Sequence, residues 1–355
     1  MQKISFYCRY ERLGASSRIR MLQFIPKLTK LYKIRVNSLL SDKYITNLYA
    51  RLPQNKLSIL LSYCKRIAQL ITDRSDVLII EKELFPYFPY WFERVFLNKK
   101  RYIIDIDDAV FHHYDLNVSP LKKILLGNKF KHLFKHSFAV LAGSPYLQEV
   151  AEFDGACNVI YFPTVVEGTR YFNATAHSPK ITDLVVIGWI GSGSTDKYLE
   201  LIRGALAQVA KVVSGRLVFK VIGSTKPLQI DGVEVVNVAW TEDSEVAAIR
   251  SIDIGIMPLE DTLWERGKCA YKLIQYMACG KPVIASAIGA NNLVVDHGLN
   301  GFLCSSESDW CDALVKLIDN RELCHQFGEH GVNKVKQHYT VDANIKILQK
   351  LLYTL

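Results

Sequence analysis

The segment best suited to chemistry, "GKCAYKLIQYMACGKPVIAS", carries two lysines four residues apart. Apolar residues recur within it at helical spacing, which predicts a helix over about residues 269–278, and Gly280 suits a left-handed C-cap. On this helix Lys268 and Lys272 would share one face near the N-terminus. Free backbone N–H groups and the helix dipole make that end attractive to anions. We expect a diphosphate there; two solvated lysines are the alternative.

A glycine- and serine-rich turn, "IGWIGSGSTDKYLEL", links an apolar run to a helical one. Gly191 and Gly193 would let the backbone approach a ligand closely. Ser192 and Ser194 can cap the following helix or bind phosphate oxygens. An ordinary strand-to-helix turn explains the same residues.

A second turn of this kind, "RLGASSRIR", follows the first apolar run. Gly14 and Ala15 permit close backbone approach, and Ser16 or Ser17 would be the N-cap. Arg18 can pair bidentately with a phosphate. A capped surface turn without a ligand is the alternative.

Three aspartates end an apolar strand in "RYIIDIDDAVFHHYD". Strand alternation points Asp105 and Asp107 to the same side. Asp107 or Asp108 could bind sugar hydroxyls or take a proton from an acceptor. His112 and His113 are nearby alternatives, and an aspartate here could also simply cap the next helix.

Short apolar runs alternate with amphipathic helical ones along the whole chain, as βαβ units require. Near-continuous Val, Ile and Leu indicate strands buried on both faces of a parallel sheet. The fold class is therefore α/β, doubly wound. The chain of 355 residues suits two domains facing a cleft. We place them at 1–170 and 171–335, with a linker over 163–182, and expect a C-terminal helix over 336–355 that packs back on the first domain.

Composition narrows the class of protein. Hydrophobic residues make up 49% and charged residues 22%, as in a folded globular protein. We find no run of membrane-spanning length and no signal peptide, so we expect the cytoplasm. The eight cysteines lack metal-ligand spacing, so we expect reduced thiols and no metal. The net charge of +9 implies an anionic partner, but no nucleic-acid-binding motif accompanies it.

Basic and aromatic segments of the first half favour one such partner. The aromatic segment "FPYFPYWF" is followed by the basic runs "NKKR", "KK" and "KFKHLFKH". Together they suggest docking on the inner face of an anionic membrane. A core-facing aromatic helix is the alternative.

The segment "MPLEDTLWERGKCAYKLIQYMACGKPVIASAIGANNLVVDHGLNGFL" resembles the nucleotide-sugar-binding segment of glycosyltransferase family 4, retaining enzymes of the GT-B fold. "GASSRIR", "DIDDAVF" and "IGWIGSGST" extend the similarity. The resemblance implies two Rossmann-like domains, an acceptor in the first and a nucleoside-diphosphate sugar in the second. It implies donor contacts from Gly14, Arg18, Gly191, Ser192, Gly193, Ser194, Lys268, Cys269, Ala270, Tyr271 and Gln275.

Two positions depart from the family. Its paired glutamates would fall on Gly267 and Gln275, and neither is acidic. Gln275 can still hydrogen-bond a ribose hydroxyl, and Glu265 would supply the missing carboxylate. Asp107 or Asp108 would stand where the family often has a histidine.

The resemblance implies a retaining, metal-independent transfer to a saccharide or lipid-linked acceptor, in the synthesis of bacterial O-antigen or capsule. A UDP sugar is favoured as the commonest donor, and no cofactor is expected. Lys272 would stabilise the leaving diphosphate, and Asp107, Asp108 and Glu265 complete the catalytic set. Two alternatives stay open: a nucleotide-sugar-binding protein without turnover, and a haloacid-dehalogenase-like phosphatase using Asp105 and Asp107 with magnesium.

Overall fold

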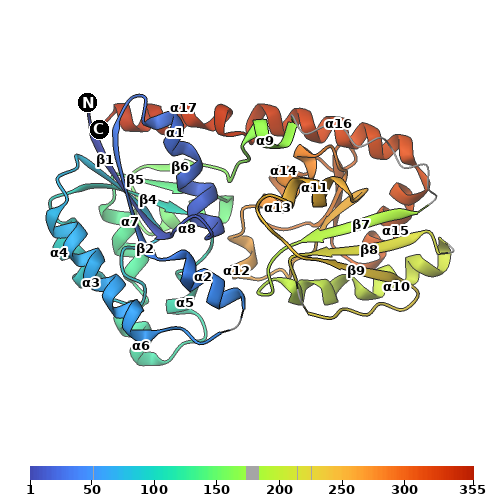
Figure 1. Ribbon diagram of the computed structural model, residues 1–355, viewed down its shortest axis with the longest axis horizontal. Coiled ribbons are helices and arrows are strands. Elements are labelled where there is room, and N and C mark those ends of the chain that lie inside the picture. The colour runs from blue at the N-terminus through green and yellow to red at the C-terminus, as the bar shows by residue number, and fades with distance from the viewer. Residues whose placement is uncertain (51, 173–183, 214, 225) are drawn as a thin grey trace. The chain divides into compact units, whose positions relative to one another are not determined.

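The computed structural model describes residues 1–50, 52–172, 184–213, 215–224 and 226–355. The chain forms two compact units. Unit 1 comprises Met1–Thr164, Arg266–Cys269 and Asn344–Leu355, and unit 2 comprises Val165–Glu265 and Ala270–Ala343. Each unit contains a six-stranded parallel sheet with helices around it (Figure 1). The predicted pair of doubly wound α/β domains is confirmed.

The sheet of unit 1 has the strand order β2-β1-β3-β4-β5-β6. Its chain order reverses between β1 and β3, so the loops after these strands flank the switch point where parallel sheets bind ligands. The strands are β1 (Lys3–Tyr10), β2 (Lys33–Leu40), β3 (Val77–Glu81), β4 (Arg101–Ile106), β5 (Ala139–Ala142) and β6 (Val159–Tyr161).

Helices of unit 1 form where the apolar spacing changes from two to three or four residues. The short helices after β1 are η1 (Ser17–Met21), η2 (Leu22–Phe24) and α1 (Ile25–Leu28). The others are α2 (Asp42–Tyr49), α3 (Lys56–Thr72), α4 (Tyr90–Leu97), α5 (His112–Asp115), α6 (Pro120–Leu126), α7 (Lys129–His136) and α8 (Pro145–Phe153).

The sheet of unit 2 has the order β12-β11-β10-β7-β8-β9, and its chain order reverses between β7 and β10. The strands are β7 (Val185–Ile190), β8 (Leu217–Ile222), β9 (Glu234–Val238), β10 (Ile254–Met257), β11 (Val283–Ser286) and β12 (Gly301–Cys304). Its helices are α9 (Gly168–Phe172), η3 (Asp196–Ile202), α10 (Arg203–Val212), α11 (Glu245–Arg250), α13 (Tyr271–Ala278), α14 (Asn291–Val294), α15 (Glu307–Asp319) and α16 (Arg321–His338). Two further helices, α12 (Leu263–Arg266) and α17 (Val341–Tyr353), end in residues that group with unit 1.

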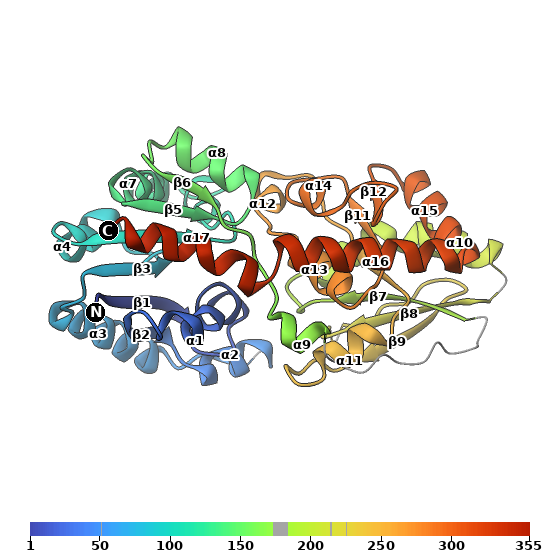
Figure 2. The same cartoon turned by 90° about the horizontal axis from the view of Figure 1, so that it is seen from above.

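Two apolar cores cover the two faces of the unit 2 sheet. One joins the sheet to α10 and α15, around Trp189 and Phe219. The other joins it to α13 and α16, around Tyr276 and Met277. Figure 2 shows α16 lying along α13. A sheet covered on both faces explains why the strands read as continuous apolar runs.

The division between the units falls at Thr164 and Val165, ahead of the expected boundary at residue 170. The reason is local: Val166 bridges to Thr340, and Tyr171 is buried in the second core of unit 2. Of the expected linker, residues 173–183 lie outside the described part of the chain. Among the described residues, no helix combines the length and apolarity needed to span a bilayer.

Candidate functional site

The turn after β7 lies beside the switch point of the unit 2 sheet. The expected strand, turn and helix are present, with η3 beginning at Asp196. Gly193 and Ser194 are exposed. The Oγ atoms of Ser192 and Ser194 lie 2.8 Å apart, and Thr195 donates its backbone N–H to the Ser192 carbonyl. The turn thus presents hydroxyl groups at the carboxyl edge of the sheet.

Lys272, in the first turn of α13, reaches this same turn. Its Nζ lies 4.1 Å from the ring centroid of Trp189 and 3.5 Å from Thr195 Oγ1. A Cβ on Gly191 would come within 2.8 Å of Nζ, so only glycine leaves the lysine this position. The structure therefore brings Lys272, Gly191 and Thr195 together, with an ammonium group held on an aromatic face.

The helix carrying Lys272 is shorter than expected, which separates the two predicted lysines. α13 begins at Tyr271 after a left-handed Ala270 with φ of 53°. Lys268 and Cys269 precede the helix and group with unit 1, so the shared helical face expected for Lys268 and Lys272 is wrong. At the other end Gly280 has φ of +70°, which confirms the predicted left-handed C-cap.

Two other predicted donor-binding residues of α13 differ in their surroundings. Tyr271 is half-buried, whereas Gln275 is buried. The Gln275 amide donates to Tyr171 Oη at 2.9 Å, and that hydroxyl donates to Glu245 at 2.8 Å. The amide nitrogen of Gln275 is thus held in an internal chain of hydrogen bonds, and its contact with a ribose hydroxyl stays a prediction.

Glu265 lies in α12, buried beside the same edge of unit 2. Its carboxylate accepts hydrogen bonds from Tyr198 and Thr262, and Lys197 Nζ lies 3.7 Å from Oε1. Burial alone would raise the pKa of Glu265, but the two hydroxyls and Lys197 outweigh it and hold the pKa below its ordinary value. Glu265 is therefore a fixed, ionised carboxylate.

The three aspartates at the C-terminal end of β4 in unit 1 are paired with cations. Asp105 is buried, and both of its oxygens accept from Arg20, at 2.5 and 3.1 Å. This bidentate pair holds η1 against the sheet. Asp105 and Asp107 are close enough to interact electrostatically, as expected from alternation. Asp105, however, is the buried counter-ion of Arg20.

Asp107 and Asp108 have different partners and opposite pKa shifts. Lys82 Nζ lies 2.9 Å from Asp107 Oδ1, and Lys268 Nζ lies 3.6 Å from Asp108 Oδ1. Burial would raise the pKa of Asp107, but Lys82 and Arg20 lower it. For Asp108, burial and the Asp107 charge raise the pKa, and Lys268 offsets them only in part. Cys269 donates its thiol to the Asp107 carbonyl at 2.9 Å.

The turn after β1 is packed into unit 1. Ser17 donates to Glu81 at 2.6 Å and accepts from the Tyr10 N–H, so it links two strands. Of the two expected N-cap residues, Ser16 occupies the N-cap position of η1, without a side-chain capping hydrogen bond. Gly14 lies against Tyr10, where a Cβ would clash. Arg18 is buried and donates to the Arg12 carbonyl at 3.1 Å, and its pairing with a phosphate stays a prediction.

Lys82 is the functional candidate that the sequence prediction missed. It is buried directly after β3, adopts φ of 63°, and binds Ser16 Oγ at 3.2 Å besides Asp107. A left-handed backbone on a non-glycine residue is costly and tends to occur at functional sites. The available signal was its position between Glu81 and Glu83, in a cluster of charges at a strand end.

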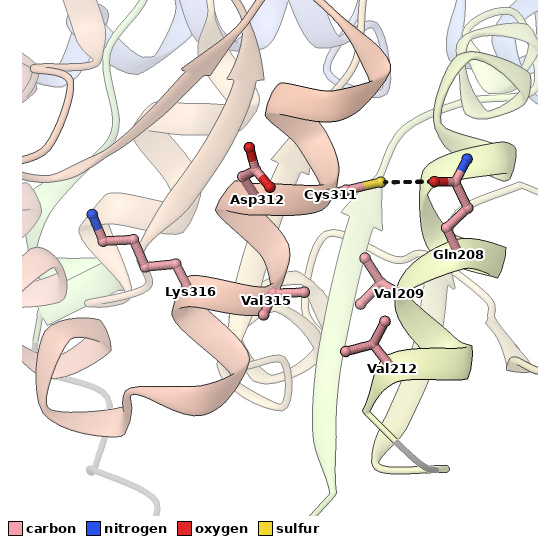
Figure 3. A pocket seen from close by; sticks show the side chains of 7 residues that line it. All are labelled: Gln208, Val209, Val212, Cys311, Asp312, Val315 and Lys316. Carbon is pink, nitrogen blue, oxygen red and sulfur yellow. Dashed lines mark hydrogen bonds between the residues drawn. The ribbon is translucent and has the colours of Figure 1, made fainter.

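A hollow on unit 2 lies away from all these residues. Its volume is about 350 Å³, and it lies between α10 and α15 (Figure 3). The lining residues are Gln208, Val209, Val212, Cys311, Asp312, Val315 and Lys316. None of the predicted site residues takes part, so we do not assign the hollow to the candidate site.

Comparisons with known proteins point to the same part of the chain. Residues 184–320 match the family model described as Glycosyl transferases group 1. An uncharacterized glycosyltransferase of Methanocaldococcus jannaschii is 30% identical over 112 residues, which are 31% of this chain and 27% of that protein. The D-inositol 3-phosphate glycosyltransferase of Corynebacterium jeikeium is 34% identical over 80 residues, 22% of this chain and 19% of that protein. The matches thus span about a quarter or less of those relatives.

Solved structures extend the likeness to the whole fold. Anabaena HepE in complex with UDP and glucose has a TM-score of 0.72 at 15% identity, covering 100% of both chains. WaaG, a glycosyltransferase involved in lipopolysaccharide biosynthesis, has a TM-score of 0.69 at 12% identity, covering 98% of this chain and 99% of the other. The predicted GT-B fold is confirmed, and residues 184–320 are similar to the group 1 glycosyl transferases.

Proposed function

We propose that the chain is a family 4 glycosyltransferase that moves a sugar from a nucleoside-diphosphate sugar, favouring UDP, to an acceptor hydroxyl. Unit 2 binds the donor and unit 1 the acceptor. The transfer retains the anomeric configuration and uses no metal ion.

The observation that carries this proposal is the position of Lys272. Its ammonium group lies beside the turn of Gly191 and Thr195, at the switch point of the unit that matches the family model. Open parallel sheets bind nucleotides at such a point. A cation next to backbone N–H groups and hydroxyls suits a diphosphate.

On the donor side, Lys272 and the N-terminus of α13 stabilise the charge that develops on the leaving diphosphate. Positive charge fixed before the reaction costs no reorganisation when the bond breaks. Trp189 holds the ammonium group at its ring face, 4.1 Å from the centroid. Glu265 is ionised and anchored, and we assign it to the hydroxyls of the donor sugar.

On the acceptor side, Asp108 is the better base of the two aspartates. A general base works best when its pKa is raised toward the working pH. The pKa of Asp108 is raised, whereas Lys82 holds that of Asp107 down. We therefore assign proton acceptance to Asp108 and the binding of acceptor hydroxyls to Asp107.

Of the two alternatives, the phosphatase loses support. Its nucleophile would be Asp105, but both oxygens of this buried carboxylate are bound by Arg20. A nucleotide-sugar-binding protein without turnover fits the same donor site, because Gln275 and Gly267 replace the family's glutamates. Measured turnover separates it from the transferase.

For the acceptor we propose a saccharide or a polyprenyl-diphosphate-linked saccharide in O-antigen or capsule synthesis, at the inner face of the cytoplasmic membrane. The support is indirect. WaaG shares the fold and acts in lipopolysaccharide biosynthesis, and the basic charge of the chain suits an anionic lipid surface.

The test is a thermal-shift panel of the purified chain with UDP, GDP, dTDP, ADP and CMP, each with and without EDTA. A ligand that binds only the folded state raises Tm by mass action. We expect one nucleoside diphosphate to raise Tm undiminished by EDTA. Lys272→Ala should abolish most of this shift.

Lys316→Ala is the matched control. Lys316 also lies over an aromatic ring in unit 2, 5.1 Å from the Phe302 centroid, but in α15. It should keep the shift. Equal loss in both variants, or a shift abolished by EDTA, would contradict the proposed donor site.

A further inference from the structure

The outer face of α3 carries an apolar stripe. Leu57, Leu61, Cys64, Ala68 and Ile71 recur at alternating steps of four and three, and all five are exposed. Leu70 and Arg66, on the opposite face, are buried against unit 1. A soluble helix normally turns such a stripe toward the core. In α3, one face is buried against unit 1, and the five exposed residues form an apolar stripe on the opposite face, toward solvent.

Two further elements of unit 1 expose large apolar side chains. In α4, Trp91 is 66% and Val95 71% exposed. In α6, Leu121 is 67% and Ile124 78% exposed. Exposed apolar side chains that gather in one patch mark interaction sites on proteins.

The loop between β3 and α4 joins these elements into one surface. The ring of Phe88 lies 5.5 Å from that of Tyr63 in α3 and 5.0 Å from that of Phe92 in α4. Lys122 of α6 lies 5.4 Å from the ring centroid of Tyr87. Figure 1 shows α3, α4 and α6 together on one side of unit 1. We call the exposed residues of α3, α4, α6 and this loop the apolar-basic surface.

The charge of this surface has one sign. The sequence contains no Asp or Glu over residues 43–72 or 116–148, and each stretch has five Lys or Arg. All residues of α3, α4 and α6 are described, and their one acid, Glu93, is buried and paired with Lys129. Lys129 is therefore not part of the basic surface predicted from "KFKHLFKH", whereas Lys131 and Lys135 are exposed.

We propose that the apolar-basic surface docks unit 1 on a bilayer that contains anionic lipids. Exposed leucines and Trp91 enter the interface while lysines contact the phosphate groups. A second copy of the chain fits less well, because pairing two such surfaces would bring lysines against lysines.

This inference deepens the proposed function, because a bilayer is where a lipid-linked acceptor would be found. Its readout is separate: vesicle binding does not depend on the nucleotide-induced rise in Tm. If the nucleotide panel fails and vesicle binding succeeds, only the transferase proposal falls. The reverse result would overturn only the docking surface.

The test is co-sedimentation of the full chain with vesicles of phosphatidylcholine alone or mixed with phosphatidylglycerol. We expect binding to the mixed vesicles that weakens with salt. Lys65→Gln with Lys123→Gln should weaken it about 25-fold, since each lysine near the surface contributes a factor of about five. Leu61→Ser with Ile124→Ser should weaken it about ten-fold or more.

The control is Lys211→Gln with Val212→Ser in α10 of unit 2, since the 67% exposure of Val212 lies between the 59% of Leu61 and the 78% of Ile124. It should bind like the wild type, and all variants should keep their Tm. Equal binding to both vesicle types, or equal loss in the control, would overturn the proposal. So would a dimer in solution that Leu61→Ser with Ile124→Ser dissociates, without any vesicle binding.

Discussion

The residues at the C-terminal ends of the strands differ in charge between the two sheets, although both sheets are six-stranded, parallel and doubly wound. In unit 1 three acids at the C-terminal ends of β3 and β4 have buried cations as partners, in the Arg20–Asp105, Lys82–Asp107 and Lys129–Glu83 pairs. In unit 2 the edge carries a Gly-Ser turn and Lys272 on an aromatic ring. Shared topology therefore sets where a ligand can bind, and the strand-end residues decide which ligand.

The difference has a physical cost. A buried ion pair loses the hydration of two charges, so it fixes geometry more reliably than it adds stability. A turn of glycines and hydroxyls costs little and offers its donors to an anion. The unit 1 edge is suited to holding carboxylates in place, and the unit 2 edge to receiving a diphosphate.

Arg20→Ala should produce the largest effect. It leaves Asp105 buried and charged without its bidentate partner, so we expect a loss of about 3–5 kcal/mol in the free energy of unfolding. Urea unfolding measures it. The control is Arg216→Ala, whose pair with Asp319 has a similar 2.8 Å distance but is 40% and 51% exposed. It should cost about 0.2–1 kcal/mol.

Equal costs for Arg20→Ala and Arg216→Ala would show that the unit 1 pair is not desolvated. Arg20→Met with Asp105→Leu sharpens the test, because an apolar pair removes both charges together. It should recover much of the loss.

Lys272→Ala should have the next largest effect, on the rate. Removing one preorganised group that stabilises developing charge costs about 10²–10³ in kcat. The measurement is kcat with the nucleotide sugar whose diphosphate raises Tm. Lys316→Ala should stay near the wild-type rate, since Lys316 lies over Phe302 in α15. A kcat unchanged by Lys272→Ala would remove the lysine from the reaction.

The sequence predicted the fold because its signals were local. Strands such as β3, "VLIIE", are wholly buried, and their runs of consecutive apolar residues predict that burial. Gly280 was recognisable because its left-handed backbone favours glycine, and Gly191 because a Cβ there would meet the Trp189 ring. From the strands we could also predict where each strand ends, and so which candidate residues lie at those ends.

Side-chain partners were not predictable in the same way. Whether Gln275 faced a ligand or Tyr171 depended on a residue 104 positions earlier in the chain. The start of α13 was misplaced because Ala270 adopts a left-handed conformation that alanine rarely takes. Asp105 was the nucleophile of the phosphatase alternative, and only its pair with Arg20 speaks against that role. Contacts between distant segments decided each case, and periodicity does not encode them.

Glu265 should make the stability of unit 2 depend on acid pH. Its pKa in the folded protein lies below the ordinary value of 4.5. Its contribution is therefore complete above about pH 4.5 and is lost as the pH falls through the lowered pKa. Glu265→Gln should lower the free energy of unfolding by about 1.5–3 kcal/mol at neutral pH, because hydrogen bonds to a charged group are lost.

The check is the difference between wild type and Glu265→Gln across the acid range, which should shrink as the pH falls. Glu200→Gln is the control, because Glu200 is exposed and forms only a surface pair with Arg203. It should leave the pH profile unchanged. A wild-type minus Glu265→Gln difference that stays constant with pH would mean that the carboxylate is not held ionised.

Variants of Lys82 should give the smallest effect, because they test only the backbone strain directly after β3 in unit 1. Both Lys82→Ala and Lys82→Gly remove the ion pair with Asp107, but only glycine adopts a φ of 63° without steric strain. Lys82→Gly should therefore be more stable than Lys82→Ala by about 1 kcal/mol. The same two changes at Lys316, within α15, should give the opposite order by about 1 kcal/mol, because glycine is a poor helix former. If both sites gave the same order, the left-handed conformation of Lys82 would carry no strain, and the ion pair with Asp107 alone would account for its position.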